Sequence, residues 1–356
     1  MSDHGIENTI VTLHSSKEIE DLLYRTKIVV LRKQSCQSKK HILKLIMEHI
    51  IDIMLLWLYV QKNRKKYDII NVHNFPANYS VFPFAKNSVW MCNEPPIQLY
   101  LTPIKNAFLL FLLRVIDRLI VRSCLRYSCV SDRFNYKRFV KIYGLEPEII
   151  NYGVDYAFFS KGNKKRARKM LHLNNKNFVL LQVGTITPLK NQIESVKTVE
   201  KLKDKIPNIK LILIGKSDKE YEKLLRQYIQ SKKLEKYVIF MEHSPRETIR
   251  DINKLCDVAI FPVKSQGGWL APFEVLCAAK PIVVSRALTC SDIIEKHKLG
   301  IVTNDFATAV LNIYNNRKKY QSMANHGKEW VKKNLTWDTF CEKMTNLFKE
   351  LMCCVA

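Results

Sequence analysis

The feature that most restricts the fold of this chain is the regular recurrence of short apolar runs. In the first half they occupy residues 9–13, 27–31, 69–72, 88–91 and 127–130, and in the second half residues 178–183, 210–214, 237–240, 258–261 and 282–285. Segments long enough to form helices separate these runs, which is the pattern of βαβ units. The sequence therefore predicts an α/β protein whose parallel sheets carry helices on both faces.

The length of the chain indicates two domains. With 356 residues and 47% hydrophobic residues, it can bury two separate cores. Residues 151–155 and the strongly basic residues 161–169 that follow them are typical of a linker. We predict two doubly wound domains, residues 1–155 and 156–335, that face each other across a cleft, followed by a terminal helix in residues 336–356.

The charge of the chain predicts an anionic partner. The formal net charge is +25, which favours nucleic acid, acidic lipids or phosphorylated substrates. The signatures of common nucleic-acid-binding modules are absent, so nucleic acid is not expected. The polar start and the lack of closely spaced cysteine pairs, apart from the last two, predict a cytoplasmic protein with reduced thiols.

Two apolar stretches, residues 42–60 and 107–121, are interrupted by charged residues and predict amphipathic helices. Their apolar stripes have two interpretations. They face the domain core, which we favour slightly, or one of them rests on a membrane with an acidic surface.

A glycine loop in the second half leads from a strand into a short helix. Gly267 and Gly268 follow the run 258–261, and Pro272 suits the first turn of a helix. The free N–H groups and the dipole at such a helix start form an anion site that fits a diphosphate. Glu274 is expected in the first turn, where it would accept hydrogen bonds from sugar or ribose hydroxyls.

A second candidate element, residues 184–192, follows the first strand of this half and places Lys190 at the start of the next helix. A lysine at the carboxyl end of a strand can neutralise the charge that develops on a leaving diphosphate. Because the chain holds 58 lysines and arginines, most of them solvated, only the surrounding pattern singles this one out.

At these residues the chain resembles the retaining family-4 (group 1) glycosyltransferases of the GT-B fold, over residues 145–345. The matching segments are 151–155, 184–192, 213–215, 256–258 and the family's Glu-x7-Glu signature, which here runs from Gln266 to Glu274. The resemblance implies that Glu274 binds the ribose, Lys190 the diphosphate, and the amides near Leu270 and Ala271 the distal phosphate. It also implies a base-recognition loop at residues 241–246, which leaves the donor base open.

The resemblance thus yields two sets of candidate residues. The implied donor-binding set is Gly184, Thr185, Lys190, Gly215, His243, Ser244, Gly267, Gly268, Leu270, Ala271 and Glu274. The implied catalytic set is Lys190, Gln266, Glu274, Asn93 and His73. No metal or other cofactor is expected, because the nucleotide-sugar is a substrate.

The chain departs from the family pattern at three of its site positions. Gln266 replaces the first carboxylate of the signature, Thr185 replaces an arginine, and Asn93 replaces a histidine in the first domain. The chain also opens on a segment similar to the family's second strand, so the usual first strand and glycine loop are missing. Either the gene start is misplaced or the N-terminal domain is reduced.

The sequence therefore predicts transfer of a sugar, with retention, from a UDP or GDP donor to a hydroxyl acceptor. The expected acceptor is a polyprenol-linked or other cell-envelope glycan, reached from the inner face of the membrane. The alternative is a catalytically weakened nucleotide-binding paralogue or a scaffold in a glycan-assembly complex. The related GT-B sugar epimerases match the linker and the signature less well.

Overall fold

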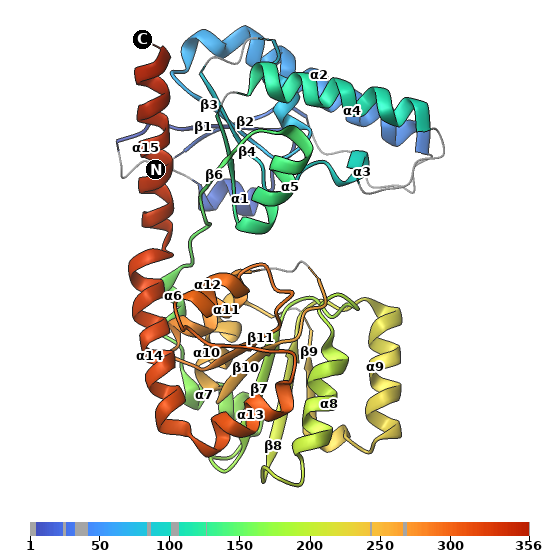
Figure 1. The fold of residues 1–356 in the computed structure, drawn as a ribbon, viewed down its shortest axis with the longest axis vertical. Coiled ribbons are helices and arrows are strands. Elements are labelled where there is room, and N and C mark those ends of the chain that lie inside the picture. Colours follow the sequence, from blue (N-terminus) through green and yellow to red (C-terminus); the bar gives the residue numbers. More distant parts are fainter. Residues whose placement is uncertain are drawn as a thin grey trace. The chain divides into compact units, whose positions relative to one another are not determined.

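A computed structural model describes residues 5–23, 26–32, 42–83, 87–100, 107–125, 127–242, 244–265 and 269–355. The chain folds into two compact units (Figure 1). The first comprises Met1–Asn151 together with Phe340–Ala356, and the second comprises Tyr152–Thr339. The boundaries inferred from the sequence, after residues 155 and 335, lie four residues away from these in each case.

The first unit contains two parallel sheets. Strands β1 (Thr9–Thr12) and β2 (Lys27–Val30) pair with each other. The larger sheet has the order β3-β4-β5-β6, with β3 at Ile70–His73, β4 at Ser88–Met91, β5 at Tyr127–Val130 and β6 at Glu148–Ile149. All five runs expected in this half are strands, whereas β6 has two residues and leaves no recognisable pattern in the sequence.

The first unit contains an aromatic core and several helices. They are α1 (Lys17–Leu22), α2 (Ile42–Asn63), α3 (Ile97–Tyr100), α4 (Ala107–Cys124) and α5 (Arg133–Tyr143), with the short 3₁₀ helices η2 (Arg64–Lys66) and η3 (Ala77–Val81). Trp90 and Tyr143 are fully buried in this core. Asp117 of α4 is buried beside them and accepts hydrogen bonds from the hydroxyls of Tyr79, Tyr100 and Tyr143 at 2.7–2.9 Å.

In the two long amphipathic helices, the apolar stripes do not simply face the domain core, which was the interpretation that we favoured. Both helices form at the expected residues, but many of their large apolar side chains are exposed, among them Met54 at 56% and Phe108 at 76%. The buried face of α4 instead includes Leu110, Asp117 and Val121. In the described ranges, no helix combines the length and the apolarity needed to cross a bilayer.

The second unit is built on one six-stranded parallel sheet with the order β12-β11-β10-β7-β8-β9. Its strands are β7 (Phe178–Val183), β8 (Ile209–Ile214), β9 (Val238–Met241), β10 (Val258–Phe261), β11 (Ile282–Val284) and β12 (Ile301–Val302). The order reverses at the middle of the sheet, between β7 and β10. Because ligands of doubly wound sheets bind where the order reverses, the carboxyl ends of β7 and β10 are the expected binding edge.

Helices cover this sheet. They are α6 (Tyr156–Phe159), α7 (Lys164–Met170), α8 (Gln192–Leu202), α9 (Lys219–Ser231), α10 (Arg246–Leu255), α11 (Leu270–Cys277), α12 (Ser291–Lys296), α13 (Phe306–Asn315) and α14 (Arg317–Asn334), with the 3₁₀ helix η4 (Glu235–Tyr237). The last helix, α15 (Trp337–Val355), begins in this unit and continues into the first.

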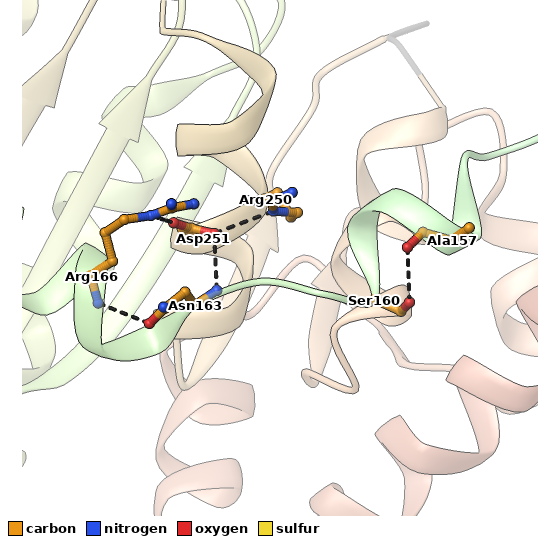
Figure 2. A network of polar contacts seen from close by, with 6 residues as sticks. All are labelled: Ala157, Ser160, Asn163, Arg166, Arg250 and Asp251. Carbon is orange, nitrogen blue, oxygen red and sulfur yellow. Dashed lines mark hydrogen bonds and ion pairs between the residues drawn. The ribbon is translucent and has the colours of Figure 1, made fainter.

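The basic stretch that we interpreted as part of a linker is a packed helix. Residues 164–170 form α7, which contacts α10. Asp251 of α10 is buried, and its carboxylate accepts hydrogen bonds from the backbone N–H of Asn163 at 2.9 Å and from the guanidinium of Arg166 (Figure 2). The Nε atom of Arg250 lies 3.3 Å from the same carboxylate. Burial alone would raise the pKa of Asp251, but these bonds outweigh it and lower the pKa. The positive charge here anchors the helix rather than marking a linker.

Candidate functional site

Two glycines shape the backbone where β7 and β8 end. Gly184 and Gly215 have φ angles of 140° and 151°, a conformation that side-chain-bearing residues rarely adopt. A Cβ atom on Gly215 would lie 2.2 Å from the carbonyl oxygen of Gly184, so the two strand ends touch through their main chains. Gly215 is therefore a residue that lets the loop after β7 lie directly against β8.

The loop after β7 is held in place from several sides. The buried side chain of Gln182 donates to the Lys190 carbonyl at 2.8 Å, and Gln192 donates to the Thr185 carbonyl at 2.9 Å. Asn191, which has a positive φ of 58°, donates from its side chain to the carbonyl of Pro262, after β10, at 2.9 Å. The loop is thereby fixed at the predicted binding edge of the sheet.

Lys190 lies over Gly184 in this loop. Its Cε atom is 4.0 Å from the position that a Cβ on Gly184 would take. The side chain is half-buried, and burial lowers its pKa. Cys290 is close enough to Lys190 to act on that pKa, and its thiol contacts the carbonyl of Trp269 at 3.6 Å. Cys290 is thus a neighbour both of Lys190 and of Trp269, the residue before α11.

Helix α11 begins at Leu270, which corrects the expected position of Glu274. Pro272 is the third residue of the helix and lies in its first turn, as expected, whereas Glu274 is the fifth and lies in the second turn. The helix starts before the proline because the first residues of a helix need no N–H partner. Since Pro272 has no N–H, the free amides nearest the helix start are those of Leu270 and Ala271.

Glu274 is half-buried, and burial raises the pKa of its carboxyl group to about 7. The positive charge of Arg246 opposes this shift. A partly buried carboxyl group with a pKa near neutrality is typical of functional sites.

Arg246 was not among the site residues predicted from the sequence. It is the first residue of α10, with its guanidinium 3.2 Å from the carboxylate of Asp155 and 4.7 Å from the centre of the Phe158 ring. Its side chain is 63% exposed. Two sequence features could have identified Arg246 as a site residue: its position at the end of the loop 241–246 and the acidic residue in the segment 151–155, with which it could pair.

The other candidate residues of this half fall into two groups. Ser244 is half-buried and donates to the Glu242 carbonyl at 3.1 Å, and Thr185 is exposed at the binding edge. His243, Gln266, Gly267 and Gly268 lie outside the described residues.

In the first unit, His73 and Asn93 lie at the carboxyl ends of the neighbouring strands β3 and β4. A nitrogen of His73 is 3.1 Å from the side-chain amide of Asn71, and Asn93 donates to the side chain of Asn74 at 2.5 Å. The His73 ring is accessible to solvent, yet surrounding protein atoms desolvate it enough to lower its pKa. These side chains form a polar cluster that can bind hydroxyl groups.

Together, the second unit offers a lysine, free helix amides and a carboxyl group that changes charge near pH 7. The first two attract a phosphate-bearing ligand, and the third accepts hydrogen bonds from hydroxyls when ionised. This combination suits a ligand that carries both phosphate and hydroxyl groups.

Comparisons with known proteins agree with this chemistry. A D-inositol 3-phosphate glycosyltransferase of Acidothermus cellulolyticus is 24% identical over 178 residues, which cover 47% of this chain and 40% of that relative. A GDP-mannose-dependent alpha-(1-6)-phosphatidylinositol monomannoside mannosyltransferase of Mycobacterium tuberculosis is 21% identical over 232 residues, 61% of this chain and 60% of the relative. The chain thus matches about half the length of such relatives.

The fold is also that of a solved structure. Anabaena HepE, crystallised in complex with UDP and glucose, superposes with a TM-score of 0.74 at 16% identity, covering 96% of this chain and 91% of HepE. Residues 163–330 match the family model of the glycosyl transferases group 1. The second unit is therefore similar to the group 1 glycosyl transferases over these residues, and the chain has the GT-B fold.

Proposed function

We propose that this protein transfers a sugar from a nucleotide-sugar donor to a hydroxyl group of an acceptor, with retention of the anomeric configuration. One observation carries the proposal: Lys190 lies over Gly184 at the carboxyl end of β7, in a loop whose backbone is fixed on several sides. Such a preorganised cation stabilises charge as it develops, and it needs no rearrangement during the reaction.

In the proposed mechanism, the donor diphosphate binds between Lys190 and the amides of Leu270 and Ala271. As the bond between the sugar and the diphosphate breaks, the leaving group gains negative charge, which the lysine and the helix dipole stabilise. This supply of positive charge replaces the metal ion that other transferases use, so we propose a reaction without a metal. Glu274 accepts hydrogen bonds from the ribose, and Gln266 from a sugar hydroxyl through its amide.

We propose UDP or GDP as the nucleotide of the donor and a lipid-linked or cell-envelope glycan as the acceptor. HepE was crystallised with UDP, and the mycobacterial relative is named for GDP-mannose and a phosphatidylinositol mannoside. The net charge of +25 supports an acceptor with phosphate groups at a membrane. The proposed location is the cytoplasm, at the inner face of that membrane.

Sugar transfer from radiolabelled UDP- and GDP-sugars to a lipid extract tests this proposal. Lys190→Ala is expected to lower the transfer rate about 100- to 1,000-fold, as loss of one preorganised donor group does elsewhere. Lys197→Ala is the matched control, because this lysine of α8 is exposed. Calorimetry with UDP and GDP shows whether the variants still bind nucleotide.

The alternative is a catalytically weakened nucleotide-binding paralogue or a scaffold. It is favoured by Thr185, which offers a hydroxyl at the binding edge where the family resemblance implies a cation, and by Gln266 and Asn93. Tight nucleotide binding without turnover on any donor would establish this alternative and end the proposal of an enzyme.

A further inference from the structure

Helix α4 carries many of its apolar side chains toward solvent, although Leu110 and Val121 are buried. Phe108, Phe111 and Leu119 are 76%, 63% and 61% exposed. Leu112 and Ile116, also exposed, follow Phe108 at intervals of four residues and therefore lie on the same side of the helix. The buried face of the helix combines Leu110 and Val121 with the charged Asp117. So many large exposed apolar side chains are not expected of a helix whose apolar stripe faces only a core.

Helix α2 presents a second apolar stripe. Ile50, Met54 and Leu58 recur at four-residue intervals and are 54%, 56% and 50% exposed. Trp57 lies on the same side, and its indole N–H donates to the backbone carbonyl of Phe82, another exposed apolar residue, at 2.7 Å. Both α2 and α4 contact η3 in the first unit.

The charges beside these stripes are positive. Lys62 in the last turn of α2, and Lys65 directly after it, are exposed, as are Arg118 and Arg122 of α4. The acidic residues of the two helices are withdrawn from the surface: Asp117 is buried, and Glu48 and Asp52 are half-buried, Asp52 in an ion pair with Arg32 at 2.7 Å.

This combination selects one kind of partner. A second copy of the chain brings the same basic residues and a net charge of +25, so self-association through this face sets like charges together. A bilayer with acidic lipids offers apolar acyl chains and negative headgroups side by side, which matches exposed apolar side chains edged by lysine and arginine. Single exposed apolar residues need no explanation, but contiguous stripes indicate an interaction site.

We propose that α2 and α4 form the surface through which this protein docks on an anionic membrane. The apolar side chains of both helices enter the boundary between headgroups and acyl chains, and the basic residues contact the headgroups. The role of this docking rests on the proposed function, because a lipid-linked acceptor lies at such a surface. Docking itself requires no sugar donor.

The test is co-sedimentation of the full chain with vesicles of phosphatidylcholine alone or mixed with phosphatidylglycerol, without nucleotide. We expect binding to the mixed vesicles and little to phosphatidylcholine alone. The double variant Leu112→Asp with Leu119→Asp is expected to lower the affinity for mixed vesicles at least about tenfold. Leu224→Asp in α9, where the leucine is 62% exposed, is the matched control and is expected to bind as the unchanged protein does.

A second pair of variants tests the charge. Lys62→Glu with Lys65→Glu is expected to weaken binding to mixed vesicles by about fivefold or more for each lysine and to reduce its salt dependence. Lys219→Glu with Lys223→Glu, exposed lysines of α9, is the control. Circular dichroism confirms that each variant is folded.

Three results would overturn the inference: no binding to mixed vesicles, equal binding by the α4 variant and its control, or a lipid-free dimer that the α4 variant abolishes. Because UDP binding is measured separately, loss of docking with intact nucleotide binding contradicts this inference alone. Docking without turnover contradicts only the proposed enzyme.

Discussion

The raised pKa of Glu274 predicts a pH dependence of stability that one substitution removes. Burial moves this pKa from 4.5 to about 7. At about 1.4 kcal/mol per pKa unit this shift corresponds to about 3 kcal/mol, and partial exposure reduces the expected value to about 2 kcal/mol. Between these two pKa values the folded state binds more protons than the unfolded state, so the free energy of unfolding falls as the pH rises through this window.

The substitution Glu274→Gln keeps the shape of the side chain and removes its ionisation. Urea unfolding of both proteins at several pH values between about 5 and 8 gives the difference in unfolding free energy, in which the contributions of other groups cancel. We expect the variant to gain about 2 kcal/mol relative to the unchanged protein as the pH rises across this range. A difference that does not change with pH would refute the reasoning, because it would show an ordinary pKa for Glu274.

Nucleotide binding gives an independent test of the ionisation of Glu274. Ribose hydroxyls that donate to the carboxylate favour its ionised form, so UDP or GDP is expected to bind the unchanged protein more tightly at pH 8 than at pH 6. Glu274→Gln is expected to bind more weakly and with little pH dependence from this group. Equal pH dependence in both proteins would separate Glu274 from the ribose.

Three further substitutions test the framework, each by thermal or urea unfolding. Gly215→Ala should destabilise the protein by more than about 3 kcal/mol, and more than Gly184→Ala, because only the first places a Cβ against main-chain atoms. Equal losses would mean that backbone strain alone matters. Asp251→Asn should lower the free energy of unfolding by about 2–4 kcal/mol at neutral pH. Because folding lowers the pKa of Asp251, this stabilisation is lost as the pH falls below 3.8, the ordinary pKa of the group. A loss of stability that persists in acid would contradict the lowered pKa. Tyr143→Phe should cost about 1–2 kcal/mol by removing one of three hydrogen bonds to Asp117, and an unchanged midpoint would show that water replaces it.

The sequence predicted the strands well because buried parallel strands leave a clear record. Residues 88–91, 127–130, 178–183 and 258–261 form strands with the expected bounds, since each is a short and mostly apolar run that is largely buried. Strands β6 and β12 have two residues each, too few to stand out from a loop.

The errors concern charged and amphipathic segments. We predicted that the basic residues of α7 belong to a linker. Composition alone does not show that Asp251, more than eighty positions away, pairs with Arg166. The apolar stripes of α2 and α4 have the same periodicity whether they face a core or a membrane, so the sequence left both interpretations open.

The candidate site was predicted unevenly. Lys190, Gly184 and Gly215 lie together at the end of the sheet, and the roles assigned to the donor-site residues remain predictions. The position of Glu274 was wrong by one turn because Pro272 marked the first turn without fixing the residue at which α11 begins. The charge of Arg246 near Glu274 follows from tertiary packing, which no local pattern contains.

The loop after β7 has a consequence for how such a protein changes over generations. Its position depends on carbonyl and amide groups of the main chain, held by Gln182, Asn191 and Gln192 and by the contact with Gly215. Thr185 and Leu189, by contrast, are exposed and take no part through their side chains in these bonds. Mutations at these two positions leave these bonds in place, so the exposed side chains at this edge of the sheet can change over generations without disturbing the main chain of the loop.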